Sequence, residues 1–175
     1  MGRNQMKTLK KFFAVSVAAA VILLAFSGCT GNKEANIDKY EVDSANVITT
    51  ELGITPKLPS DASDAKYYVI DTVAQINYTA DGESYVFRAQ KVDGVDVSGI
   101  EAGDKQLKDT FDLVENSESA TISFYEVKSG GLLAGWSIGG TSYSLFNSSA
   151  SASDELSYAT FADVADTLAG ENAPA

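Results

Sequence analysis

The residue that most directly predicts a chemical modification is Cys29, the only cysteine in this chain of 175 residues. It follows two small residues, Ser27 and Gly28, which come after a basic and then an apolar segment. A basic start, an apolar middle and small residues before the cleavage site are the three parts of a secretory signal peptide. We therefore interpret residues 1–28 as a cleaved signal peptide, with cleavage between Gly28 and Cys29.

The four residues FSGC at 26–29 resemble the lipobox of bacterial lipoproteins, which usually has leucine where Phe26 stands. The resemblance implies that the Cys29 thiol carries a diacylglycerol and that its new amine is a further site of acylation. Two or more acyl chains hold a protein firmly on a membrane. The alternative is an uncleaved anchor, but the apolar run at 12–26 is shorter than the roughly 20 residues of a spanning helix. We expect a lipoprotein on the extracytoplasmic face of the cell membrane.

The residue types that are missing exclude several chemistries. The chain contains no histidine and no second cysteine. Ser–His–Asp triads, Cys–His nucleophiles and zinc sites built on histidine or cysteine therefore cannot form within this sequence, and neither can a disulfide. Carboxylate chemistry, Ser–Lys chemistry and metal binding by oxygen atoms remain. We expect no cofactor and no enzymatic activity.

The charge balance also limits the partners. There are 24 acidic and 13 basic residues, which gives a net charge of −11 at pH 7. Four of the basic residues precede position 12, where no acidic residue occurs, so the rest of the chain is more acidic still. Such a surface repels nucleic acid, and it favours cationic partners or simply solubility. We expect no nucleic-acid partner.

Carboxylates are the commonest groups with catalytic potential, and a carboxylate-dependent hydrolase of the cell envelope is the alternative function. The candidates near predicted strands or turns are Asp109, Asp112, Glu115 and Glu126. Nothing in the sequence singles out two of them as an acid and base pair.

A segment rich in aspartate and glycine, residues 93–104, has oxygen atoms to offer a calcium ion. It begins DGVDVSG and continues with Glu101 and Asp104. Calcium takes six to eight oxygen ligands, and this spacing does not match the twelve-residue EF-hand loop. An acidic loop rich in turns is the simpler interpretation, and the sequence leaves calcium binding open.

Three aromatic residues, Tyr125, Trp136 and Tyr143, lie on adjacent predicted strands. Aromatic side chains on one face of a sheet can form a platform for a sugar or a peptide. They are more commonly core residues or cross-strand partners. The platform interpretation makes an envelope protein or a glycan the candidate partner.

The hydropathy pattern predicts one domain at residues 51–170, between a flexible tether at 29–50 and a disordered tail at 171–175. A short helical turn is compatible with residues 44–52. Apolar residues then alternate with a period of two, which is typical of strands. Expected strands are 67–70, 73–79, 84–92, 110–114, 121–128, 132–138 and 142–146, with a loop at 93–108 and a hairpin turn at Asp81-Gly82.

The period changes again near the end of the chain. An apolar stripe at 154–168 predicts a helix of about four turns, which we expect to begin with a capping box from Ser151 to Asp154 and to end at Gly170. The stripe needs a surface to cover, and one face of the sheet is the candidate. The expected class is α+β: an antiparallel β-meander of about six to seven strands with a C-terminal helix packed on one face.

Several segments resemble a domain family of unknown function, found in Gram-positive lipoproteins and in extracytoplasmic parts of anti-sigma-type membrane proteins. The resemblance spans about residues 52–170. It is carried by the order and spacing of segments 67–71, 74–78, 85–89, 96–99, 134–136 and 140–145 and the helix after them. It implies an antiparallel sheet with a C-terminal helix and extracytoplasmic sensing or binding, and it assigns no catalytic residue.

The sequence therefore predicts a membrane-anchored, non-enzymatic binding or interaction domain with an unknown ligand. Two alternatives stay open: the envelope hydrolase, and a carrier that holds a hydrophobic ligand under the sheet.

Overall fold

The computed structural model describes residues 38–174, which belong to one unit of the chain. The predicted signal peptide and Cys29 lie outside the described residues. No helix between residues 38 and 174 is long and apolar enough to cross a membrane. The elements, in chain order, are β1 (Lys39–Val42), α1 (Ala45–Leu52), β2 (Ser63–Ile70), β3 (Val73–Ala80), β4 (Glu83–Gln90), the 3-10 helix η1 (Ala102–Asp104), β5 (Lys105–Glu115), β6 (Glu118–Val127), β7 (Leu132–Ile138), β8 (Thr141–Asn147) and α2 (Glu155–Glu171).

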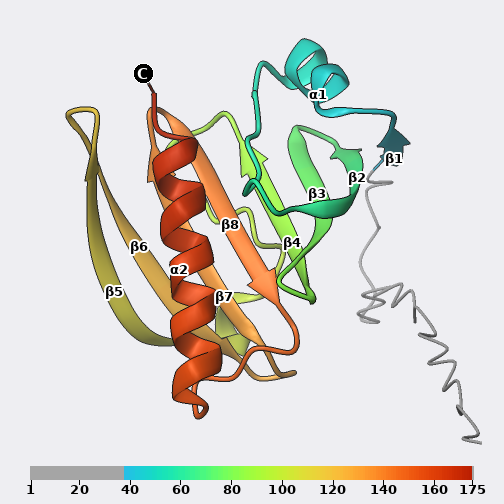
Figure 1. Cartoon of the computed structure of the whole chain (residues 1–175). Helices are drawn as coiled ribbons and strands as arrows, with labels where there is room; N and C mark the ends of the chain where they lie inside the picture. The colour runs from blue at the N-terminus through green and yellow to red at the C-terminus, as the bar shows by residue number, and fades with distance from the viewer. Residues whose placement is uncertain (1–37, 175) are drawn as a thin grey trace, which may run out of the picture. The chain divides into compact units, whose positions relative to one another are not determined.

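All eight strands form one antiparallel sheet in the order β1-β2-β3-β4-β8-β7-β6-β5. The expected α+β class, with a C-terminal helix on the sheet, is confirmed, and there is one strand more than the upper expected number. The strands do not form a single meander. Two four-stranded meanders, β1–β4 and β5–β8, join where β4 pairs with β8. The chain therefore leaves β4 near the middle of the sheet and resumes at its far edge, in β5 (Figure 1).

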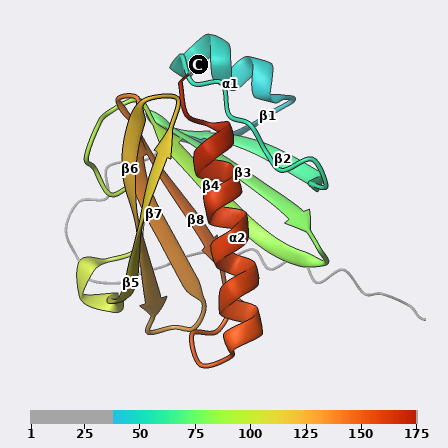
Figure 2. The same ribbon diagram turned by 60° about the vertical axis from the view of Figure 1, so that its left-hand side comes forward.

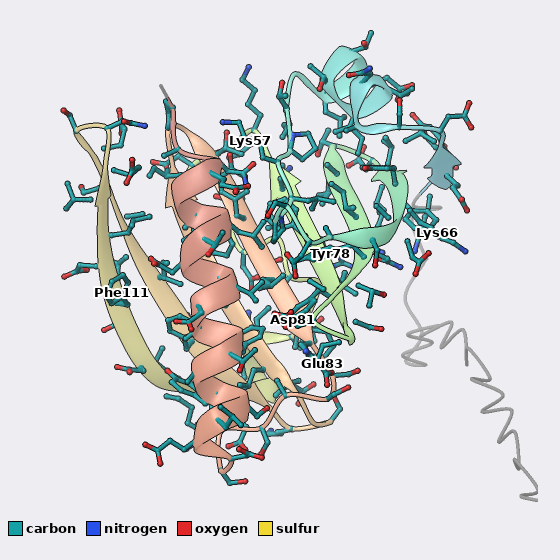
Figure 3. The ribbon with its side chains drawn as sticks, in the orientation of Figure 1. Lys57, Lys66, Tyr78, Asp81, Glu83 and Phe111 are labelled. Carbon is teal, nitrogen blue, oxygen red and sulfur yellow. The ribbon has the colours of Figure 1, made fainter. Side chains whose placement is uncertain are left out.

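Alternating apolar residues explain why β3 and β4 pair in this register. Ile76 faces Phe87 across the pair and Tyr78 faces Tyr85, and all four side chains are buried. The turn between the strands has positive φ at both Asp81 (50°) and Gly82 (80°), as a type I′ hairpin turn requires. The predicted Asp-Gly hairpin is therefore confirmed. In Figure 3 Tyr78 lies within the sheet, whereas Asp81 and Glu83 lie at the end of this hairpin.

Helix α2 covers one face of the sheet, which we call the helix face. The ring of Phe124 on β6 packs against Tyr158 and Phe161 of α2, with centroid separations of 5.9 and 6.3 Å. In an antiparallel sheet, residues that face each other across a pair share a face, as do alternate residues of one strand. Phe124 faces Ala134, so Trp136 also belongs to the helix face, together with its partner Tyr143.

The start of α2 differs from the expected capping box. Asp154 is the N-cap, and one oxygen of its side chain accepts hydrogen bonds from the backbone N–H groups of Leu156 and Ser157, each at 3.1 Å. Ser151 instead bonds to Ser153 through its hydroxyl. The capping-box prediction was wrong because Asp154 alone satisfies two free N–H groups of the first turn.

The end of the chain also differs from prediction. Helix α2 continues through Gly170 to Glu171, and Asn172 bonds through its side chain to the backbone of Lys57. Ala173 is buried. The Pro174 ring packs directly on Gly139, so closely that a Cβ added there would lie 2.2 Å from the ring. The described residues up to 174 are therefore packed on the domain rather than forming a disordered tail.

The domain begins before position 51, within the predicted tether. Strand β1 pairs with β2, with Tyr40 opposite Val69 and Val42 opposite Tyr67. In α1, Ile48 is fully buried, and Gly53 ends the helix in the left-handed conformation (φ 66°). The tether prediction was therefore wrong from residue 39 onwards, while the predicted helical turn is present as two full turns.

The N-cap can be tested by mutation. We expect Asp154→Ala to lower the free energy of unfolding by about 1 kcal/mol, because two N–H groups of the first turn lose their acceptor. Ser151→Ala should lower it by less than half as much, since Ser151 caps nothing. Urea unfolding followed by circular dichroism measures both variants, and equal losses would contradict this assignment of the cap.

Candidate functional site

The connection from β4 to β5, residues 91–104, lies across the face of the sheet opposite α2. We call this connection the crossover and the face beneath it the crossover face. Backbone N–H groups of Gly94 and Val95 each donate to a serine hydroxyl of the sheet at 3.1 Å, Ser137 on β7 and Ser142 on β8. Ser142 in turn donates to the carbonyl of Val92 at 2.7 Å. Figure 2 shows the crossover, in yellow-green, and α2 on opposite sides of strands β5–β7.

A partly buried arginine, Arg88, holds the crossover in place at Ser98. Arg88 on β4 donates to the carbonyl of Ser98 at 2.5 Å and to the side-chain oxygen of Gln75 at 2.9 Å. Burial lowers the pKa of the Arg88 guanidinium, and the Asp96 carboxylate opposes this effect. Gly99 gives the guanidinium its room, because a Cβ there would lie 2.2 Å from Nη1.

An ion pair joins the crossover to the start of β5. Asp96 accepts from Nζ of Lys105, the first residue of β5, and from the backbone N–H of Ser98. Burial by itself would raise the pKa of the Asp96 carboxyl, but the hydrogen bonds from Lys105 and Ser98 outweigh it and hold this pKa below its usual range. The side chain of Lys105 is only 10% exposed.

Between the crossover and the sheet lies a hollow with a volume of about 540 Å³. We call it the crossover hollow. Crossover residues 93–98 form one wall, Lys105 and Tyr125 belong to another, and Gly135 and Ser144 lie on neighbouring strands of the sheet beneath. This volume falls in the range of small-molecule sites, about 300–1,000 Å³.

The hollow exists because small residues occupy the centre of the sheet beneath it. Gly135 on β7 pairs directly with Ser144 on β8, and a Cβ on Gly135 would have its nearest contact, at 3.9 Å, with the carbonyl oxygen of Tyr143. Ser144 is 3% exposed as a whole residue, and its hydroxyl has no hydrogen bond to residues 38–174 but is reached by solvent in the hollow. Its neighbours Ser137 and Ser142 bond to each other and to the crossover. Ser144 therefore offers a free hydroxyl group to the hollow.

The predicted aromatic platform of Tyr125, Trp136 and Tyr143 does not form. Tyr125 faces Leu133 across the β6–β7 pair and so lies on the crossover face, whereas Trp136 and Tyr143 lie on the helix face. Trp136 and Tyr143 are 4% and 7% exposed and stack on each other at 5.5 Å. Burial raises the pKa of the Tyr143 hydroxyl, which donates to the carbonyl of Asn172. These two side chains therefore belong to the core on the helix face, and Tyr125 is the one of the three on the face of the hollow, although all three residues are among those that line it.

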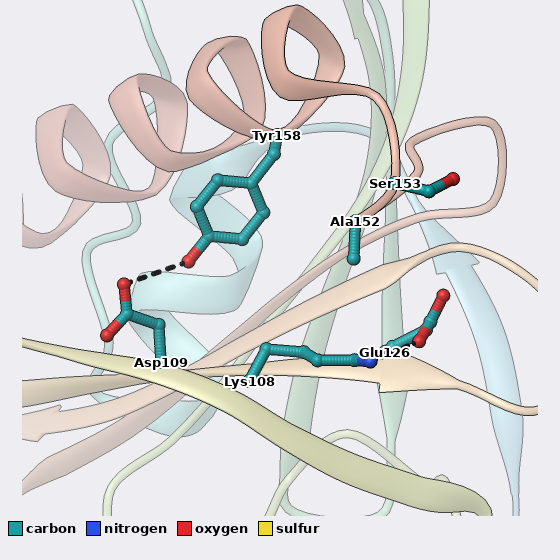
Figure 4. Close-up of a pocket in the computed structure, with 6 residues that line it drawn as sticks. All are labelled: Lys108, Asp109, Glu126, Ala152, Ser153 and Tyr158. Atoms are coloured by element: carbon teal, nitrogen blue, oxygen red, sulfur yellow. Dashed lines mark hydrogen bonds and ion pairs between the residues drawn. The ribbon is translucent and has the colours of Figure 1, made fainter.

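A second hollow, of about 320 Å³, lies where the start of α2 meets β5 and β6 (Figure 4). It brings together Asp109 and Glu126, two of the four predicted catalytic candidates, but not Asp112 or Glu115. Lys108 pairs with Glu126 at 2.6 Å, and the Tyr158 hydroxyl donates to Asp109 at 3.4 Å. Both carboxylates therefore already have partners, and this hollow offers a ligand fewer free groups than the crossover hollow.

The acidic loop 93–104 forms most of the crossover, and two of its four carboxylates pair with lysines. Asp96 pairs with Lys105, and Asp104 pairs with Lys128 at 3.6 Å. Within residues 38–174, no three carboxylate, histidine or cysteine side chains are placed to hold a metal ion. The structure gives calcium binding by this loop no support.

Comparisons with protein-family models, with curated proteins and with solved structures find no match for this chain. The resemblance to the domain family of unknown function therefore stays a prediction.

Sequence reasoning missed most of the residues that build the crossover hollow. Arg88, Lys105 and Ser144 have no local pattern that marks them, because their partners lie on other strands. The one available signal was the stretch DVSG at 96–99, which carried part of the resemblance. Its aspartate, serine and glycine all meet Arg88 or Lys105 in the structure.

The role of Gly99 can be separated from backbone strain with a matched pair of glycines. Gly94 and Gly99 both have φ of 68°, but a Cβ at Gly94 meets nothing within 4 Å. We expect Gly94→Ala to lower the free energy of unfolding by about 1 kcal/mol, the cost of the left-handed conformation. Gly99→Ala should cost at least about 1 kcal/mol more, because it displaces Arg88 from Ser98. Urea unfolding would refute this role for Gly99 if both variants lost the same stability.

Proposed function

We propose that this protein is a lipid-anchored, extracytoplasmic binding protein that holds a small polar ligand in the crossover hollow without transforming it. The observation that carries the proposal is the hydroxyl of Ser144, which lines the hollow, is reached by solvent there and has no hydrogen bond to residues 38–174. A serine hydroxyl both donates and accepts hydrogen bonds. A ligand in the hollow could therefore bond to Ser144 in place of solvent.

Binding is favoured over catalysis because two of the three charged residues of the hollow pair with each other, which leaves Asp93 as its one free charged group. The two ends of the Asp96–Lys105 pair satisfy each other, which leaves neither free to act as a general base or acid. The polar lining is also a poor match for the carrier of a hydrophobic ligand. Serines and charged residues line the space together with apolar residues such as Leu133 and Ala120, so it is not an apolar tunnel.

The anchor is proposed from the sequence around Cys29 and is tested separately from the hollow. We expect cells fed an alkyne-bearing palmitate analogue to label the full chain, and Cys29→Ser to abolish both the label and recovery in the membrane fraction. Ser27→Ala, which keeps a small residue before the cysteine, is the matched control and should be labelled like the wild type. A wild-type chain that stays unlabelled and cytosolic would refute the anchor.

The binding site is tested by filling the hollow. We expect full chain, incubated with a detergent extract of the cell envelope and washed, to retain a small molecule that native mass spectrometry detects. Gly135→Leu should release it, because the leucine side chain would occupy the hollow. The backbone tolerates the substitution, since a Cβ on Gly135 would have ordinary contacts. Lys57→Ala is the control. The Lys57 side chain does not bond to Asn172, which is held by the Lys57 backbone, so this variant should retain the small molecule. Retention by Gly135→Leu, or no adduct on the wild type, would contradict the proposal.

A further inference from the structure

We propose that the crossover hollow is a subsite for a neutral saccharide, with a sugar hydroxyl bonded to Ser144 and a sugar ring packed on Tyr125. The inference rests on the proposed function and names the chemical class of its ligand. Three observations select this class: the free hydroxyl, the balance of charge in the lining and the half-buried aromatic ring.

The hydroxyl of Ser144 matches the hydrogen-bonding character of a sugar. A serine hydroxyl donates one hydrogen bond and accepts others, and each sugar hydroxyl has the same dual capacity. Because Ser144 is 3% exposed and lies opposite a glycine, a ligand group must enter the hollow to reach it. A hydroxyl on a ring fits this task better than a bulky charged group, which would lose its hydration there.

The charges in the lining disfavour an anionic ligand. Lys105 and Asp96 pair with each other, so an anion would have to displace Asp96 from Lys105. The remaining charged residue of the hollow is Asp93, which has no hydrogen bond or ion pair with residues 38–174. Asp93 repels anions, and a lone carboxylate readily accepts hydrogen bonds from neutral hydroxyl groups.

Tyr125 supplies the apolar surface that a sugar ring requires. Its ring is half-buried and lies on the crossover face, with Nζ of Lys105 at 5.7 Å from the ring centroid. Its hydroxyl bonds to none of the described residues, so the side chain offers both an apolar body and a polar tip. Aromatic side chains with this combination are suited to ligands that are apolar on one side and polar at the rim.

The test measures direct binding of defined sugars to the full chain, kept in a detergent without a sugar headgroup. The probes are four neutral trisaccharides: triacetylchitotriose, cellotriose, maltotriose and mannotriose. We expect isothermal titration calorimetry to show saturable binding of at least one of them with a Kd below about 1 mM. Ser144→Ala should weaken that binding about tenfold, and Tyr125→Ala by a similar factor.

Two further variants keep the result interpretable. Gly135→Leu should abolish binding, whereas Ser84→Ala, an exposed strand serine outside the hollow, should leave the Kd unchanged. Circular dichroism confirms that each variant is folded. No binding of any of the four probes to the wild type overturns the proposal, and so does binding that Ser144→Ala and Gly135→Leu both leave intact.

Failure of this inference can be told apart from failure of the proposed function. If the wild type retains an envelope molecule that Gly135→Leu releases, but none of the trisaccharides binds, the hollow is a binding site and its ligand is not a neutral sugar. A peptide or a phosphorylated compound identified as that molecule would have the same consequence. If the wild type neither retains a molecule nor binds a sugar, both proposals fail.

Discussion

The candidate site depends on the attachment of the crossover to the sheet by Arg88. This guanidinium extends from β4, near the middle of the sheet, and bonds to the carbonyl of Ser98 on the crossover and to Gln75 on β3. A partly buried cation needs such partners, because an unpaired charge away from water is costly. With the guanidinium in place, residues 93–98 are held over the sheet, and the space between them becomes a hollow rather than open solvent. The left-handed Gly99 is required by the same contact.

The two faces of the sheet are built on different physical principles. The helix face is apolar: Trp136, Tyr143 and Phe87 stack there with centroid separations of 5.5–6.3 Å, and α2 covers part of this face. The crossover face is held by hydrogen bonds between serine hydroxyls and crossover backbone. Apolar burial supplies most of the stability and is insensitive to direction, whereas hydrogen bonds require defined geometry. The apolar helix face therefore contributes most of the stability, and the crossover face is the one on which we propose binding.

Local patterns explain which parts of this architecture were predictable. The β3–β4 hairpin and α2 depend on residues close in sequence, namely an Asp-Gly turn and an apolar stripe, and both appear where the pattern places them. The pairing of β4 with β8 and the edge position of β5 depend on contacts between distant segments, which no local period encodes. The face assignment of Tyr125 failed for the same reason. One residue of register separates the two faces of a strand, and the register of β6 against β7 is a property of the whole sheet. Strand β1 was missed because four residues, with burial supplied by β2, are too short to show a period.

The composition at the centre of the crossover face also argues for a functional constraint. Gly135 and Ser144 are paired in β7 and β8, interior strands of the sheet, where β-branched and aromatic residues are normally favoured. A glycine in a strand weakens it, and it commonly marks a close approach of backbone or ligand. Here no backbone takes up the space, since a Cβ at Gly135 would have only one contact, at 3.9 Å. Larger side chains at these two positions would fill the hollow and strengthen the strands. The fold itself therefore does not require small residues there, whereas the proposed ligand would.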